Sequence, residues 1–210
     1  MHAYILLDRS GSMQSLWVEA LSSVNAYAKE LANKTGGDAV DSHVTFAVFD
    51  GQEGLQFDVL RRKQPALHWE KVTDADASPR GMTPLLDALG RIISLAETDN
   101  PEKAVIVVMT DGQENASREV TREGAKAALD RVKAKGWDVV FLGANFDNIS
   151  DASSVGVFAG QQMSMAPGTM AASMKRVAEK SRAYFSRNQR HEFDEADRSV
   201  AQESKVKGNK

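Results

Sequence analysis

The stretch Tyr4-Ile5-Leu6-Leu7-Asp8-Arg9-Ser10-Gly11-Ser12 passes from an apolar run into a polar loop. The run is typical of a buried strand, and the acidic, glycine-containing cluster after it predicts a tight loop. Asp8, Ser10 and Ser12 carry side-chain oxygens at alternate positions of this loop. One carboxylate and two hydroxyls could supply part of the near-octahedral oxygen shell of Mg²⁺, with the other ligands coming from elsewhere. Because Asp, Ser and Gly are also common turn residues, this stretch alone leaves an ordinary turn equally open.

Beyond this loop, helical and strand patterns alternate along the chain. Apolar residues spaced three and four apart predict helices at residues 15–33, 85–96, 118–135 and 168–187. Apolar or alternating runs predict strands at residues 4–7, 43–49, 55–60, 104–109, 137–143 and 157–159. This order predicts an α/β three-layer sandwich, with a doubly wound, mostly parallel six-stranded sheet and helices on both faces. Residues 55–60 follow a hairpin signal and alternate in polarity, so we expect an antiparallel edge strand there.

The length and apolar content suit one domain. The chain has 210 residues, of which 42% are hydrophobic, enough to bury a substantial core. We expect the domain to span residues 1–187. Residues 188–210 are charged, mixed in sign and nearly without large apolar side chains, so we expect a flexible tail there, with Phe193 as its one possible anchor.

Composition also excludes several classes of function. The formal net charge is −3 and both signs are interspersed, so neither nucleic acid nor an anionic membrane is an expected partner. The absence of cysteine excludes disulfides, thiol catalysis and thiolate metal sites, and the 4 histidines show no ligand spacing. The chain starts without a basic leader, and no stretch has the apolar length of a membrane span. We therefore expect a cytoplasmic protein, and a monomer.

Two predicted strands end in an acid. Asp8 follows the strand at 4–7, and Asp111 follows the strand at 104–109. Sheets of this kind bind ligands outside the carboxyl ends of their strands, where the strand order reverses. Thr83 precedes Pro84 at the start of a predicted helix, where it would lie beside the two acids or simply cap the helix. Three separate segments could thus bring oxygens to one place.

These segments resemble the metal-ion-dependent adhesion site (MIDAS) of the von Willebrand factor A (vWA) domain. That site is written D-x-S-x-S, then a distant Thr, then a distant Asp at a strand end, usually followed by Gly. The corresponding residues are Asp8-Arg9-Ser10-Gly11-Ser12, Thr83 and Asp111-Gly112. The resemblance covers roughly the first 185 residues and implies the strand order 3-2-1-4-5-6 in a stand-alone domain of bacterial or bacteriophage type. It also implies that Ser10 and Ser12 are direct metal ligands, while Asp8, Thr83 and Asp111 act directly or through water.

The resemblance further implies a bridging role for the metal. Mg²⁺, with Mn²⁺ or Ca²⁺ as alternatives, would keep one position open for a Glu or Asp of a protein partner, so we expect a protein-protein interaction module and no enzyme. One alternative is a Mg²⁺-dependent phosphotransferase or phosphatase, resembling haloacid dehalogenases, that uses Asp8. That chemistry needs a second carboxylate two residues later, where this chain has Ser10. Another alternative is a metal-free vWA scaffold that binds partners through ordinary surface contacts.

Overall fold

The computed structural model describes residues 1–33, 40–144 and 150–207, and within them a single six-stranded sheet. Its strands are β1 (His2–Asp8), β2 (His43–Gly51), β3 (Leu55–Pro65), β4 (Ala104–Thr110), β5 (Asp138–Ala144) and β6 (Gln162–Met165). The order across the sheet is β3-β2-β1-β4-β5-β6. Every neighbouring pair is parallel except β2 and β3, which are antiparallel. The predicted fold class, strand order and antiparallel edge are therefore confirmed.

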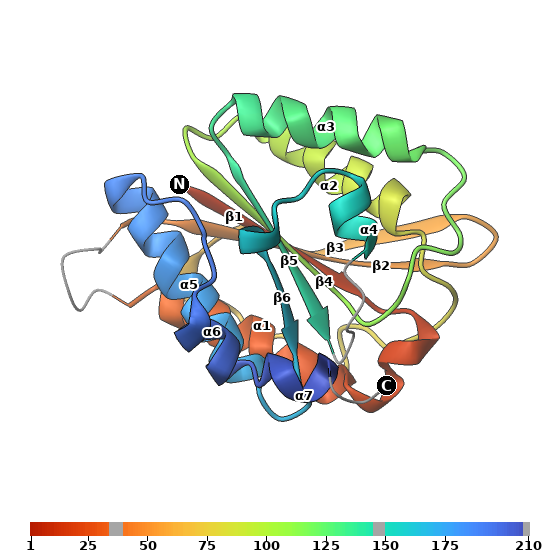
Figure 1. The fold of residues 1–210 in the computed structure, drawn as a ribbon, viewed down its shortest axis with the longest axis horizontal. Coiled ribbons are helices and arrows are strands. Elements are labelled where there is room, and N and C mark those ends of the chain that lie inside the picture. The colour runs from red at the N-terminus through yellow and green to blue at the C-terminus, as the bar shows by residue number, and fades with distance from the viewer. Residues whose placement is uncertain (34–39, 145–149, 208–210) are drawn as a thin grey trace.

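Helices cover both faces of the sheet (Figure 1). They are α1 (Trp17–Leu31), α2 (Leu85–Asp99), α3 (Arg122–Ala134), α4 (Ser150–Ser154), α5 (Met170–Arg187), α6 (Glu195–Val200) and α7 (Glu203–Lys207). Short 3₁₀ turns are η1 (Gly11–Ser15), η2 (Ala66–His68) and η3 (Ala159–Gln161). The apolar residues of α1 and α5 pack on one face, and those of α2 and α3 pack on the other.

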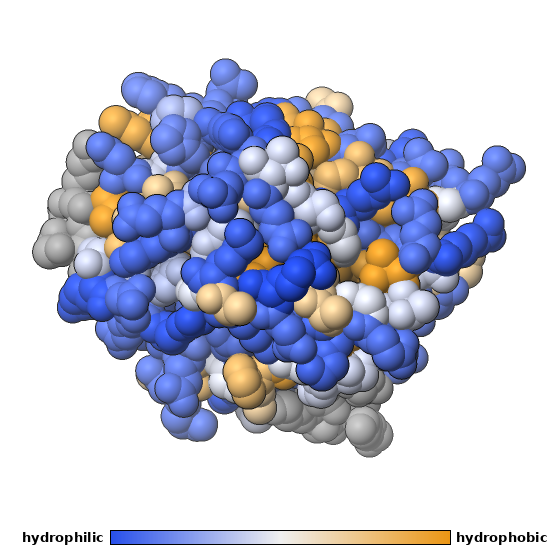
Figure 2. Space-filling view, turned by 90° about the horizontal axis from the view of Figure 1, so that it is seen from above, coloured by the Kyte–Doolittle hydropathy of each residue, from blue (hydrophilic) through white to orange (hydrophobic). Residues whose placement is uncertain are grey.

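The central strands owe their continuous apolar sequences to burial on both faces. In β1, Ile5 and Leu7 point toward α1 and α5, whereas Tyr4 and Leu6 point toward α2 and α3. All residues of β1, β4 and β5 are buried. Parallel strands covered by helices on both sides require this pattern. The outer surface over α3 and its surroundings is mostly hydrophilic, with apolar residues in small, separate patches (Figure 2). No helix within the described ranges is long and apolar enough to span a membrane.

The last strand lies later in the chain than predicted. The expected strand at 157–159 is wrong, because β6 is formed by Gln162–Met165. Its polar residues are buried and satisfied by distant groups: the Gln162 side chain donates to the Val157 carbonyl at 2.5 Å, and the Ser164 N–H donates to Glu203 Oε1 at 3.0 Å. These contacts depend on the folded chain, so the local pattern of alternating Gln, Met and Ser does not predict the strand.

The C-terminal segment is folded, so the flexible tail expected at residues 188–210 is wrong for its described part. Residues 195–207 form α6 and α7. Phe193, Ala201 and Val206 are buried. The Ala201 carbonyl accepts the N–H of Ala166, just beyond β6, at 2.9 Å. Together with the Glu203 contact, this shows that the segment covers the outer edge of the sheet, where unpaired N–H groups would otherwise be exposed.

Ion pairs explain how such a charged segment can be buried. Asp197 is fully buried, and its carboxylate lies 2.7 Å from Lys180 Nζ and 3.2 Å from Arg176 Nε of α5. Asp194 and Asp197 also form a reciprocal capping box at the start of α6. Composition alone suggested disorder because it does not show which charges are paired.

Candidate metal centre

Asp8 lies at the centre of the loops that follow β1 and β4. The two strands are adjacent and parallel, with Leu7 opposite Met109, so their carboxyl ends meet. Asp8 is fully buried: its Oδ1 accepts the Ser10 N–H at 2.7 Å, and its Oδ2 accepts the Thr110 hydroxyl at 2.6 Å. The carboxylate therefore joins the two loops and fixes the turn that carries Ser10 and Ser12.

A chain of close oxygens runs from the first loop to the second. Ser10 Oγ lies 3.0 Å from Ser12 Oγ, and the Ser12 hydroxyl donates to Asp111 Oδ1 at 2.7 Å. Neighbouring ligands of an octahedral Mg²⁺ ion, with bonds of about 2.1 Å, are about 3.0 Å apart. The three side chains are therefore spaced as adjacent ligands of one small cation would be.

Thr83 borders the same space through Gly112. A Cβ atom on Gly112 would lie 3.4 Å from Thr83 Oγ1 and 3.7 Å from Ser12 Oγ, so this position is within van der Waals contact of both hydroxyls. Thr83 is held in place by Asn115, whose Oδ1 accepts the Thr83 N–H at 2.9 Å and whose N–H donates to the Thr83 carbonyl at 3.2 Å. The structure thus brings all five predicted ligands, Asp8, Ser10, Ser12, Thr83 and Asp111, to one group of loops.

Thr83 does not cap α2. The helix begins at Leu85, its N-cap position is Pro84, and Thr83 lies one residue before that position. Glu114 takes over part of the capping, because its Oε2 accepts the Leu86 N–H at 2.8 Å. The Thr83 hydroxyl is therefore not committed to the start of the helix.

An ion-pair network that sequence analysis missed holds these loops from behind. Arg9 is buried and pairs with Asp50 at 2.5 Å and with Asp58 at 2.5 Å. The Arg80 side chain also pairs with Asp50, at 3.2 Å, and the Arg80 main-chain N–H donates to the Arg9 carbonyl at 2.7 Å. A further main-chain bond of 3.1 Å joins the Gly11 N–H to the Gly81 carbonyl. These contacts join the first loop to the Thr83 loop. The only sign of this network in the sequence was an arginine inside the D-x-S-x-S motif.

Burial makes both carboxylates of the site less acidic than usual. It raises the pKa of Asp8 to about 6, although the hydrogen bonds from Thr110 and Ser10 lower that pKa. Burial also raises the pKa of Asp111, against the hydrogen bond from Ser12. A bound cation would favour the charged form of each acid. Within the described ranges, no cluster of three or more His, Asp or Glu side chains could hold a metal, so this hydroxyl-rich group is the candidate.

The residues present fit a hard divalent cation by their chemistry. They offer two carboxylates and three hydroxyls, all of them oxygen donors, around a space that the absent side chain of Gly112 leaves open. Oxygen-only sets of this kind suit Mg²⁺, Mn²⁺ or Ca²⁺. Two carboxylates supply at most two negative charges, and even five direct side-chain ligands would leave room in a six-coordinate shell for a further ligand.

Solved structures share this fold at low sequence identity. The pilus adhesin SpaC from Lactobacillus rhamnosus GG matches with a TM-score of 0.64 and 13% identity, over 90% of this chain and 31% of that one. Manganese-loaded Plasmodium vivax TRAP protein matches with a TM-score of 0.52 and 15% identity, over 82% of this chain and 70% of that one. Mussel byssus proximal thread matrix protein 1, with a zinc-occupied MIDAS motif, matches with a TM-score of 0.54 and 16% identity, over 84% of this chain and 45% of that one. The chain thus spans less than half of the mussel protein's length.

Family comparison covers nearly the whole sequence. No curated protein matches the chain. The family model for the von Willebrand factor type A domain, in contrast, matches residues 3–194, which include all of the sheet except His2 and all five candidate ligands. The chain belongs to the von Willebrand factor type A domain family.

Proposed function

We propose that this chain is a divalent-metal-dependent protein-binding module. Asp8, Ser10, Ser12, Thr83 and Asp111 would hold Mg²⁺, and a Glu or Asp of a partner protein would complete its coordination. The observation that carries the proposal is the Ser10–Ser12–Asp111 chain of oxygens, at 3.0 and 2.7 Å, beside the space left by Gly112. Those separations match adjacent positions of an octahedral shell.

The choice of Mg²⁺ rests on the donor atoms. Hydroxyl and carboxylate oxygens favour hard cations, and none of the five candidate ligands is an imidazole or a thiolate that would select a softer metal. Manganese in the TRAP protein and zinc in the mussel protein are reasons to include both ions in any test. Mn²⁺ and Ca²⁺ remain alternatives to Mg²⁺ in this chain.

A protein carboxylate is the proposed partner group because of charge and access. The hydroxyls of Ser10, Ser12 and Thr83 are neutral ligands, so the ion keeps a strong attraction for an anionic oxygen. Ser12 is exposed and Asp111 is partly exposed, so the ion's open side would face solvent. The relatives named as adhesins support a binding role, whereas the partner and the cellular compartment stay predictions.

The position of Asp8 argues against the enzymatic alternative. A carboxylate nucleophile needs direct access to its substrate, but Asp8 is fully buried. The second carboxylate that a phosphotransferase would use as acid and base is replaced by Ser10. Turnover of a phosphoester such as p-nitrophenyl phosphate that is lost in Asp8→Asn would instead favour the enzyme.

Proton relaxation with Mn²⁺ tests the open coordination position. Mn²⁺ bound to the protein should strongly enhance water relaxation through its exchangeable water ligands, and a Glu-containing peptide should lower that enhancement by displacing water. The matched peptide with Gln in place of Glu should not. If Mn²⁺ binds without exchangeable water, or if both peptides act equally, the bridging role is wrong.

A further inference from the structure

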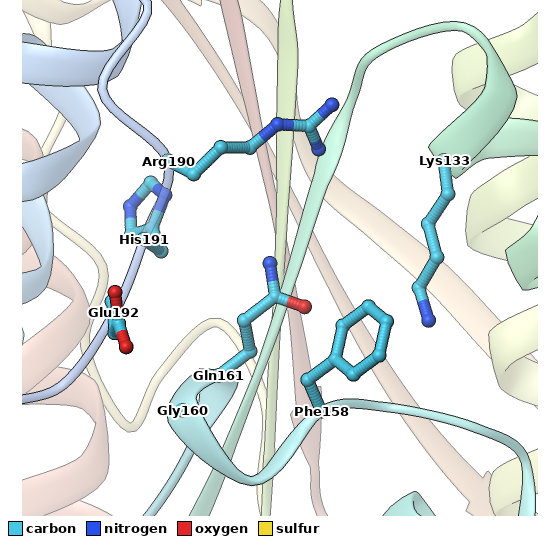
Figure 3. Close-up of a pocket in the computed structure, with 7 residues that line it drawn as sticks. All are labelled: Lys133, Phe158, Gly160, Gln161, Arg190, His191 and Glu192. Carbon is cyan, nitrogen blue, oxygen red and sulfur yellow. The ribbon is translucent and has the colours of Figure 1, made fainter.

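A cavity lies at the end of the sheet opposite the candidate metal centre. Its volume is about 480 Å³, within the range of small-molecule sites. It is lined by Lys133, Phe158, Gly160, Gln161, Arg190, His191 and Glu192 (Figure 3). Arg190 and His191 are bound to Asp138, the first residue of β5, whereas Asp8 is the last residue of the parallel strand β1. The cavity is therefore separate from the metal-site loops.

Gln161 brings an unsatisfied amide to this cavity. Its side chain is buried, with 8% of the residue exposed, and its Oε1 has no hydrogen-bond partner. Such a group, removed from water and left unpaired, is destabilising. Figure 3 shows the amide directed into the cavity, between Arg190 and Phe158. An N–H or O–H of a bound ligand would supply the missing hydrogen-bond donor.

Arg190 offers a guanidinium edge to the same space. Its Nη1 donates to Asp138 Oδ1 at 2.7 Å and to the Trp137 carbonyl at 3.2 Å. Neither its Nε nor its Nη2 forms a hydrogen bond or ion pair within the described part of the chain, and about half of the side chain is exposed. Figure 3 shows the guanidinium reaching across the cavity. Two N–H groups along one edge of a guanidinium match the two oxygens of a carboxylate.

His191 supports Arg190 and is not itself available to a ligand. Its Nδ1 lies 2.9 Å from Asp138 Oδ2, and its Nε2 lies 3.0 Å from Ser181 Oγ. Asp138, His191 and Ser181 are all buried, so this row of three side chains is a structural contact between β5 and α5. It fixes the main chain beside Arg190 and so fixes where the guanidinium points.

Phe158 and Lys133 line another side of the cavity (Figure 3). Phe158 is 68% exposed, which is unusual for so large an aromatic side chain. Lys133 Nζ lies 4.5 Å from the centre of the Phe158 ring, and burial lowers the pKa of Lys133. Lys133 therefore covers one face of the ring, and the opposite face is the flat surface on which another ring could stack.

We propose that this cavity binds a small aromatic carboxylate. The carboxylate would pair with Arg190, the ring would stack on Phe158, and a hydroxyl or N–H on the ring would donate to Gln161 Oε1. Lys133 and Arg190 are the cations of the lining and Glu192, exposed on the rim, is its anion, so an acid of single charge is favoured over a nucleoside di- or triphosphate. This inference does not depend on the proposed function.

The test is calorimetry with 4-hydroxybenzoate in the presence of EDTA, so that no metal ion can capture the carboxylate. The comparison compounds are 4-hydroxybenzamide, which is neutral, and ADP. We expect saturable binding of the acid with a millimolar or lower Kd, at least tenfold weaker binding of the amide and of ADP, and a change in the Gln161 side-chain NMR signals. No saturable binding of the acid, or equal or tighter binding of either comparison compound, would overturn the proposal.

Single substitutions in the cavity separate this site from non-specific binding. Phe158→Ser, Gln161→Met and Arg190→Lys should each weaken the acid at least tenfold, because each removes one of the three contacts while keeping the fold. Leu67→Ser removes an apolar residue that is 60% exposed elsewhere, and Arg91→Lys changes an exposed arginine on α2. Both controls should bind as the parent protein does. If the three cavity variants bind the acid as tightly as the parent protein does, the proposed site is wrong, whatever the affinity of the parent protein.

Discussion

Ser12 Oγ lies 2.7 Å from Asp111 Oδ1, although the two residues are 99 positions apart in the chain. The contact exists because β1 and β4 are adjacent and parallel, so the loops after them meet. It joins the D-x-S-x-S loop to the acid at the second strand end. The proposed metal would take the place of this hydrogen bond, with both oxygens turned to the ion.

The space beside Gly112 should be required for metal binding. Gly112→Val would place side-chain atoms next to Thr83 Oγ1 and Ser12 Oγ, because even a Cβ atom would lie 3.4 and 3.7 Å from them. We expect Mg²⁺ affinity to fall at least tenfold, measured by calorimetry. Gln113→Val, at the exposed neighbouring position, is the control and should bind Mg²⁺ normally. Equal affinities of the two variants would mean that the ion does not lie between Thr83 and Ser12.

Mg²⁺ affinity should depend on pH through Asp8. Burial raises the pKa of Asp8 to about 6, and a cation binds the deprotonated carboxylate. Affinity should therefore fall below about pH 6, by up to about tenfold per pH unit. Calorimetric titrations between about pH 5 and about pH 8 measure this change. An affinity that stays constant across that range would argue against a charged Asp8 in the bound state.

The same pKa shift has the opposite effect on the metal-free fold. Because the folded pKa of Asp8 lies above its unfolded value of about 3.9, Asp8 contributes stability that is fully present below about pH 4 and is lost as the pH rises through about 6. Urea unfolding in EDTA should show this contribution as a difference from Asp8→Asn, which cannot titrate. If the difference between the two proteins does not change with pH, the pKa of Asp8 is not raised.

Arg9 should be essential for stability although it lies inside a predicted metal loop. Arg9→Met would leave the buried carboxylate of Asp50 with only the longer contact to Arg80, and we expect a loss of about 3–5 kcal/mol in the free energy of unfolding. Asp58, the other partner of Arg9, is 52% exposed, so Asp58→Asn should cost about 1 kcal/mol or less. Urea unfolding of both variants in EDTA makes the comparison. Similar losses of unfolding free energy in the two variants would show that the buried Arg9–Asp50 pair contributes no more stability than the exposed Arg9–Asp58 pair.

The C-terminal segment should behave as part of the fold. Asp197→Ala would leave Lys180 and Arg176 without their buried partner and remove half of the capping box, at a cost of about 3 kcal/mol. Glu195→Ala, on the exposed first turn of the same helix, should change stability by no more than about 0.5 kcal/mol. Thermal unfolding distinguishes the two. If neither variant changes the thermal stability, the C-terminal segment is not part of the fold, and the flexible tail expected from composition would be correct.

Local sequence patterns predicted the strands and helices whose apolar residues follow a regular spacing. The continuous apolar runs of β1 and β4 identify central strands, and their order brings Asp8 near Asp111. Contacts between distant charges could not be predicted in this way. Arg9 pairs with residues 41 and 49 positions away, so its sequence neighbours give no sign that it is buried.

Polar residues that are buried in the finished fold were the other source of error. Gln162 and Ser164 look like loop residues until Val157 and Glu203 satisfy their polar groups. Asp197 looks solvent-exposed until α5 supplies its cations. Gln161 could not be singled out at all, because an unsatisfied amide is visible only once its surroundings are known.

The most direct test of the metal centre is the Mg²⁺-induced shift in melting temperature of Asp111→Ala. The parent protein should be stabilised by Mg²⁺, since a ligand that binds only the folded state raises its melting temperature. Asp111→Ala should fold, because burial already disfavours its charged carboxylate, but should show no Mg²⁺ shift. Asp130→Ala, an exposed acid on α3, should keep the full shift. A full Mg²⁺ shift in Asp111→Ala would contradict the assignment of the metal to this site.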